Sequence, residues 1–288
     1  MNGSRSEGRG IVTMTIDMFF TILTQPFVIR AVVVGVLVSL CAALLGVVLV
    51  LKKYSLIGHG LADVGFASVA LALALGINPM YISLPVVLIA SFIIMAVSQK
   101  KGVSGDTAIG VAATTSLAIG IMITYLGKGF NADISDYMFG SINAVTKTDV
   151  YMSAILSAIV IIIYILFYNR IFIITCDEPF AKASGINVSM YRFLISFLTA
   201  LTIVMGMRMM GSLLISSLII FPAVTARNFA GSFKSLVITS GICSVVCFLI
   251  GIALTICFDL PTGAGIVIVN AAAMIISSIY GKLIKKHA

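Results

Sequence analysis

The sequence predicts an all-α fold, a polytopic bundle of about eight or nine transmembrane helices. Of its 288 residues, 60% are hydrophobic and 10% are charged, whereas a soluble domain carries about 25% charged residues. Mean hydropathy is +1.19, and apolar runs of about 20 residues, the length that crosses the hydrocarbon core as a helix, recur along the chain. These runs are continuously apolar and do not alternate, which favours helices over a β-barrel.

Nine apolar segments are predicted to span the membrane. They are residues 28–51, 58–76, 80–98, 107–126, 150–168, 190–207, 211–227, 235–257 and 263–281. Residues 13–24 are too short to span and are expected to lie along the interface. The chain is therefore divided into an N-terminal segment, 1–25, and one transmembrane domain, 26–288. An additional span in the N-terminal segment is the alternative, and a cleaved signal peptide is not expected.

The basic residues predict which loops face the cytoplasm. If alternate loops are assigned to the two sides of the membrane, one side holds 12 of the 18 lysines and arginines, including Lys52, Lys182 and Arg192. Most acidic residues fall on the other side, for example Asp136 and Asp149. The positive-inside rule therefore predicts a cytoplasmic C-terminus and an external N-terminus.

Several functions are excluded by missing motifs. The net charge of +8 could suggest nucleic-acid binding, but the basic residues are dispersed in short loops between spans, so no nucleic-acid partner is expected. There is no Gly-x-x-x-x-Gly-Lys-Ser/Thr nucleotide loop, and with two histidines there is no His-Glu-x-x-His metalloprotease motif. The chain is therefore not expected to be an enzyme. The five cysteines form no Cys-x-x-Cys pair and indicate no disulfide framework.

The second predicted span contains a candidate metal site. His59 and Asp63 are four residues apart, so a helix places them on one face with their Cβ atoms about 5–6 Å apart. An imidazole and a carboxylate at that spacing can share a divalent ion such as zinc or manganese. The alternative is structural: His59 faces interfacial water, and Asp63 pairs with a neighbouring helix.

A short cytoplasmic helix is predicted near residues 177–188. Asp177 can cap it, Glu178 and Pro179 fall in its first turn, Ala181 follows, and Gly185 can end it. Such a helix on the cytoplasmic face is a candidate docking element for a soluble partner. The alternative is an ordinary interfacial loop.

Three weaker features lie within the spans. Pro222 is predicted to kink or break the span 211–227, as in helices that border transport paths, although a purely structural kink is the alternative. A methionine cluster could indicate copper(I), but no paired thiol ligands accompany it. It comprises Met205, Met207, Met209 and Met210. Cys243 and Cys247 share a helix face and are expected to pack as small apolar residues.

Segments along most of the chain, from about residue 26 to 281, together resemble the membrane permeases of the metal-importing ABC transporter family, which take up zinc and manganese in bacteria. The segments that carry the resemblance are Tyr54–Ala72, Asp106–Gly110, Asp177–Val188, Gly211–Arg227 and Asp259–Gly263. In one motif the chain departs from the family. The family's second span typically reads Gly-Asp-x-Leu-(Ser/Ala)-His, whereas here Gly58 is followed by His59 and, four residues later, Asp63. The aspartate and histidine are thus exchanged.

The resemblance implies a permease of the type II ABC importer kind in the cell membrane of a bacterium. It implies a homodimer in membrane lipid, cytoplasmic ATPase subunits that use ATP, and an extracellular metal-binding protein. Residues 177–188 would be the coupling helix, and His59 and Asp63 would hold the transported Zn or Mn ion, with no permanently bound cofactor. Three rival functions are a permease for a metal chelate or vitamin, an ATP-independent secondary metal transporter, and a membrane scaffold without transport activity.

Overall fold

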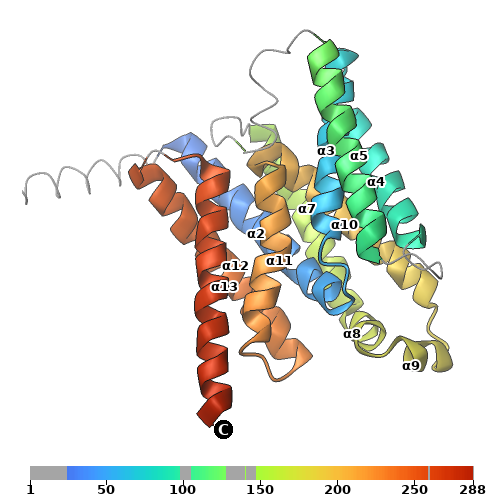
Figure 1. Ribbon diagram of the computed structural model, residues 1–288, viewed down its shortest axis with the longest axis vertical. Helices are drawn as coiled ribbons and strands as arrows, with labels where there is room; N and C mark the ends of the chain where they lie inside the picture. The colour runs from blue at the N-terminus through green and yellow to red at the C-terminus, as the bar shows by residue number, and fades with distance from the viewer. Residues whose placement is uncertain (1–24, 98–104, 128–139, 141–146, 259, 288) are drawn as a thin grey trace, which may run out of the picture.

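The chain folds into a helical bundle in which long, nearly antiparallel helices lie side by side (Figure 1). The computed structural model describes residues 25–97, 105–127, 140, 147–258 and 260–287. Within these residues all regular secondary structure is helical. Eight of the helices are long and apolar enough to cross a membrane, which confirms the predicted all-α membrane fold.

The helices follow one another with short connections. They are α2 (Pro26–Leu51), α3 (Ile57–Ala74), α4 (Pro79–Val97), α5 (Gly105–Leu126), α7 (Lys147–Leu166), α8 (Tyr168–Cys176), α9 (Glu178–Ala183), α10 (Val188–Met210), α11 (Ser212–Arg227), α12 (Phe233–Phe258) and α13 (Thr262–His287). The interfacial segment expected at 13–24, most of the acidic loop between α5 and α7, and Asp259 lie outside the described residues.

The remaining predicted span, 211–227, is present as α11, a shorter apolar helix of 16 residues. It starts after a sharp reversal at Gly211, whose φ of 86° is accessible to glycine without steric cost. The break expected at Pro222 is wrong, because α11 continues through this residue to Arg227. A proline removes one N–H group from the helix, and membrane helices tolerate that loss where neighbouring helices pack around the freed carbonyl. Pro222 is buried in this way.

Helices α2 and α11 form the centre of the bundle. Helix α2 packs against α7, α10, α11 and α12, while α11 also contacts α3 and α13. Close approach depends on small residues, as is usual where lipid supplies no hydrophobic driving force between helices. A Cβ atom on Gly46 of α2 would overlap the backbone carbonyl oxygen of Ile219 in α11. The two helix backbones are therefore in direct contact at this point.

Helix ends that the charge pattern assigns to one side of the membrane lie together in the structure. In Figure 1, α8, α9 and the C-terminus lie at the lower end of the bundle. Lys52 at the end of α2 reaches the same end, because its Nζ atom donates to Glu178. Phe233 at the start of α12 packs on Tyr168 and Phe172 of α8. Arg208 near the end of α10 and Asp149 near the start of α7 form an ion pair at the other end of the bundle.

The contact at Gly46 predicts the effect of one methyl group. Gly46→Ala should lower the free energy of unfolding by about 1–3 kcal/mol, because the added Cβ meets backbone and cannot be accommodated by a side-chain rotation. Thermal unfolding of the purified protein in detergent measures the effect. Gly110→Ala in α5 is the matched control, since its Cβ would meet nothing within 4 Å. Equal melting temperatures for the two variants would contradict the packing described here.

Candidate functional site

Helix α3 brings His59 and Asp63 together as the sequence predicts. The Nε2 atom of His59 lies 3.6 Å from the Oδ2 atom of Asp63. The two side chains differ in exposure: that of His59 is 55% exposed and that of Asp63 is 10% exposed. The pair therefore combines a nearly buried carboxylate with an imidazole that is accessible from outside this chain.

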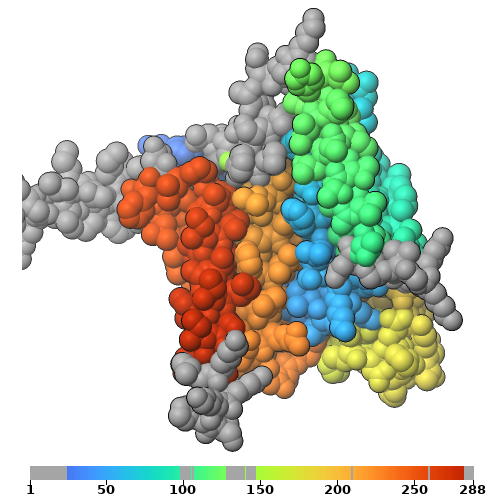
Figure 2. All heavy atoms as spheres, viewed as in Figure 1, coloured from blue at the N-terminus to red at the C-terminus, as the bar shows by residue number. Residues whose placement is uncertain are grey.

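The neighbouring glycines show where the pair points. A Cβ on Gly58 would approach Ile219 of α11 to 3.0 Å, and a Cβ on Gly60 would approach Ile109 of α5 to 2.7 Å. His59, between them in sequence, is consequently directed into the gap between α11 and α5. Figure 2 shows a strip of α3 exposed between these two helices. Residues four apart share a helix face, so Asp63 faces the same strip.

One chain supplies two metal-ligating side chains at this position. Among the described residues, no group of three or more His, Cys, Asp or Glu side chains could hold a metal ion. Zinc in proteins is usually four-coordinate, and nitrogen and oxygen ligands also suit manganese. An ion bound by His59 and Asp63 would complete its coordination with water or with groups from another chain.

A second element lies at the lower end of the bundle in Figure 1, where the short helix α9 follows α8. The Asp177 carboxylate caps α9 by accepting a hydrogen bond of 2.9 Å from the backbone N–H of Phe180. Pro179 is in the first turn, Ala181 is buried beneath the helix, and Gly185 has a φ of 78° just after its end. The helix and its cap were both expected from the sequence, although α9 itself is shorter than the predicted segment. The Phe180 ring, in contrast to Ala181, is 58% exposed.

Glu178 takes part in an ion network that sequence reasoning did not anticipate. Its Oε2 atom accepts from Lys52 Nζ at 2.8 Å, and its Oε1 atom lies 2.7 Å from Arg192 Nη2 and 3.0 Å from Lys182 Nζ. Partial burial alone would raise the pKa of Glu178. The hydrogen bonds from Lys52 and Lys182, together with the charges of Lys52 and Arg192, outweigh burial and lower the pKa to about 2.

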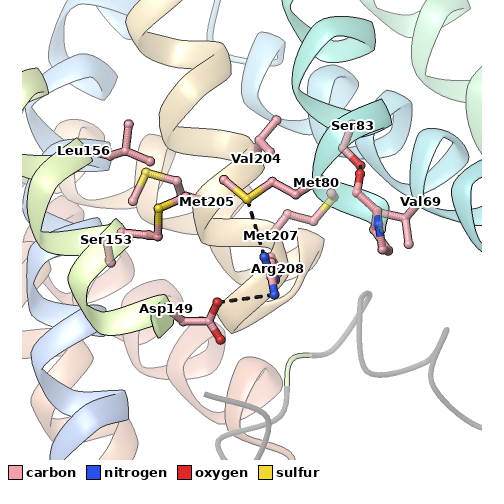
Figure 3. A pocket seen from close by; sticks show the side chains of 12 residues that line it. Val69, Met80, Ser83, Asp149, Ser153, Leu156, Val204, Met205, Met207 and Arg208 are labelled. Carbon is pink, nitrogen blue, oxygen red and sulfur yellow. Dashed lines mark hydrogen bonds and ion pairs between the residues drawn. The ribbon is translucent and has the colours of Figure 1, made fainter. Parts of the chain in front are cut away.

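A methionine-rich pocket lies at the other end of the bundle (Figure 3). The cavity is small, about 30 Å³, and is lined by residues of α3, α4, α7 and α10, among them Met80, Met152, Met205 and Met207. Arg208 also lines it, with a nitrogen 3.5 Å from the Met80 sulfur and another 3.3 Å from Asp149. A guanidinium against the thioether disfavours a second cation, which argues against a copper(I) site here.

The cysteine pair of α12 behaves as expected from its spacing. The Sγ atoms of Cys243 and Cys247 are 3.9 Å apart, and both cysteines are free. Cys247 is buried. The pair packs within the bundle and lies on a different helix from His59 and Asp63.

Fold and charge distribution together define a multi-pass helical membrane protein. Comparison with known proteins then identifies its family. A model of the ABC 3 transport family matches residues 24–281. The chain therefore belongs to the ABC 3 transport family, as the sequence segments led us to expect.

Individual relatives align over nearly their whole length. The chain is 32% identical over 247 residues to the high-affinity zinc uptake system membrane protein ZnuB of Haemophilus influenzae. The aligned region covers 86% of this chain and 95% of that protein. It is 28% identical over 251 residues to the manganese import system permease protein ScaB of Streptococcus gordonii, which covers 87% and 90% of the two chains. The solved structure of PsaBC from Streptococcus pneumoniae in complex with Fab superposes with a TM-score of 0.81 at 29% identity, covering 91% of this chain and 95% of that one.

The low pKa of Glu178 predicts a pH-dependent contribution to stability. Because its pKa in the folded protein, about 2, lies below the usual 4.5, the carboxylate stabilises the fold above pH 4.5 and loses this effect as pH falls toward 2. Glu178→Gln should therefore lower the melting temperature at pH 7, and the difference from the native chain should shrink in acid.

Asp177→Asn is the matched control for that measurement, since it removes a carboxylate from the same turn but retains a good helix cap. Its melting temperature at pH 7 should stay close to that of the native chain. A difference between Glu178→Gln and the native chain that is the same at pH 7 and pH 3 would show that the ion network contributes nothing.

Proposed function

We propose that this chain is the membrane permease of an ATP-driven importer of a divalent transition metal, zinc or manganese, in the cell membrane of a bacterium. The observation that carries the proposal is the His59–Asp63 pair on α3, in which an exposed imidazole lies 3.6 Å from a nearly buried carboxylate. An ionisable side chain within a membrane span is costly to bury and typically serves transport. Relatives whose names specify zinc uptake and manganese import support this reading.

The incomplete ligand set favours a homodimer with the metal path between two copies. One chain offers one imidazole and one carboxylate, and two chains facing each other across the α3 strips would offer four ligands. Exposed apolar side chains beside the strip, such as Val111 of α5 and Leu213 of α11, would be covered in such a dimer. A homodimer with two-fold symmetry is also the commonest form of oligomer.

The energy source would be a separate cytoplasmic ATPase subunit. This sequence has no nucleotide-binding loop, and the exposed Phe180 on the capped helix α9 offers an apolar contact for a groove on such a subunit. On the opposite side, an extracellular metal-binding protein would deliver the ion. Membrane lipid would surround the outer helices, on which many large apolar residues are exposed.

Transport would proceed by alternating access. The ion enters from the outer end, is held briefly by His59 and Asp63, and leaves toward the cytoplasm when the ATPase subunits move α9. Binding here has to be weak, because an ion held too tightly would not leave. Protons compete with metal for the imidazole, so uptake should fall in acid. The exchanged order of histidine and aspartate places the imidazole nearer the cytoplasmic end of α3 and the carboxylate deeper.

His59→Ala and Asp63→Ala should each reduce ATP-dependent uptake of Zn²⁺ or Mn²⁺ by at least ten-fold. Loss even of a group that only orients a metal ligand costs about 10- to 100-fold in affinity. The measurement is uptake of radioactive Zn²⁺ and Mn²⁺ into vesicles that contain the permease, its ATPase and the binding protein. Leu71→Ala on the same helix is the matched control, because its side chain is exposed and carries no ligand.

Three other results would redirect the proposal. An unchanged uptake rate in both variants would show that the pair is not the metal site. Uptake of the metal only when it is bound to a chelator would favour a permease for chelates. Uptake without the ATPase subunit would indicate a secondary transporter.

Phe180→Asp should weaken the complex with the ATPase by about 2 kcal/mol or more, as expected for loss of an aromatic anchor at an interface. Co-purification of the ATPase subunit with the permease measures this effect. Tyr81→Asp replaces an exposed ring at the opposite end of the bundle and serves as the control. If both variants retain the ATPase equally, Phe180 is not the docking contact.

A further inference from the structure

We infer that Glu178 is a positioning residue that connects the coupling helix α9 to the helix carrying His59 and Asp63. The inference rests on the proposed function, since it assigns a role within metal import. Sequence reasoning grouped Glu178 with residues that contact the ATPase. The structure turns its carboxylate in the other direction, toward the ends of the membrane helices.

The contacts of the carboxylate show this direction. Glu178 opens α9, while Lys52 lies 126 residues earlier at the end of α2, and Arg192 lies in the first turns of α10. The side chains of Lys52, Glu178 and Arg192 are all less than one third exposed. Charges this shielded cost free energy when one partner is removed, because the others remain without compensation. Glu178 therefore holds three helices in one arrangement.

From Lys52 the connection to the candidate metal site is short and stiff. Helix α2 ends in a Schellman motif: Tyr54 N–H donates to Leu49 C=O at 2.8 Å, and Lys53 N–H donates to Val50 C=O at 3.2 Å. Lys53 accordingly has a φ of 61°, a left-handed conformation that side chains other than glycine rarely adopt. A displacement of Lys52 is therefore transmitted through this fixed turn to the start of α3.

Helix α3 begins within four residues of that turn. Ile57 N–H donates to Tyr54 C=O at 3.0 Å, so the turn leads directly into the helix, and His59 is its third residue. The network thus joins α9 to the candidate metal-ligating pair through eight residues of chain, from Lys52 to His59. No loop long enough to absorb the motion intervenes.

Arg192 supplies a second connection through α10. That helix packs against α3, and a Cβ on Gly65 would overlap the side chain of Met207. The carboxylate thus engages α2, which precedes α3 in sequence, and α10, which is one of the helices packed against α3. A small cavity of about 30 Å³ borders Lys52, Glu178 and Arg192.

The inference predicts a change in coupling without a change in docking. The test uses vesicles that contain the complete transporter. The Glu178→Gln permease should still bind the ATPase, and the complex should hydrolyse ATP within about two-fold of the native rate. The number of metal ions taken up per ATP should fall about ten-fold, which is within the usual range of coupling between sites. Lys52→Met should behave in the same way. The double variant should be no worse than Glu178→Gln alone, because the loss of Glu178 already removes the Lys52–Glu178 interaction.

Glu178→Asp and Lys234→Gln are the comparison variants. Glu178→Asp keeps the charge and should recover part of the ratio of ions to ATP. Lys234→Gln removes an exposed charge from the same end of the bundle and should leave the ratio unchanged. A native ratio in Glu178→Gln would overturn the inference. So would a parallel loss of ATPase binding, hydrolysis and uptake, which would mean that Glu178 acts in docking or folding.

A second readout separates this inference from the proposed function. The chain contains no tryptophan, so Leu56→Trp, at an exposed position directly before α3, reports the position of that helix by fluorescence. ATP should change this fluorescence in the complex, and Glu178→Gln should abolish the change. If the native complex takes up neither metal but the fluorescence behaves in this way, the proposed substrate fails and the role of Glu178 stands. If ATP changes the fluorescence equally with and without Glu178, the inference fails whatever is transported.

Discussion

The hydrocarbon core of a membrane offers no water to hydrogen-bond, and most features of this protein follow from that condition. Each backbone N–H and C=O group within a span needs a partner in the protein, so the spans are helical. Many polar side chains within the spans likewise hydrogen-bond to backbone carbonyls. Thr199 and Ser216 donate to carbonyls one turn earlier, and Ser244 donates to the carbonyl of Ser39 on α2 at 3.0 Å. Polar residues are thereby accommodated in the bundle and also link its helices.

Charged groups are accordingly concentrated at the helix ends. The Lys52–Glu178–Arg192 network lies at one end and the Arg208–Asp149 pair at the other. Asp63 departs from this distribution, since it is nearly buried in α3 and away from the ends of that helix. A carboxylate at such a position is stabilised by a cation or by a polar path. The pair that Asp63 forms with His59 is therefore a candidate functional site. The ion network at the end of α2 is linked to this pair, because one tight turn joins α2 to α3.

Local patterns predicted the parts of the candidate site whose geometry depends on neighbouring residues in sequence. The spacing of His59 and Asp63 placed them on one helix face, and the structure brings them to 3.6 Å. The Asp177 cap and the turn at Gly185 were likewise expected from residue types. Pro222 shows the limit of such reasoning. Proline lowers helix stability locally, but burial between neighbouring helices keeps α11 intact, and the chain reverses at Gly211 instead.

By itself the sequence determined the membrane class, the approximate spans and the two short motifs, because hydropathy, helical period and capping act over a few residues. Tertiary structure alone decided that Glu178 faces Lys52, 126 residues away, and that His59 points into the gap between α5 and α11. It also decided that methionines of three helices meet around Arg208. These contacts depend on how helices distant in sequence pack, and packing between apolar surfaces in lipid is set by shape, which hydropathy does not encode.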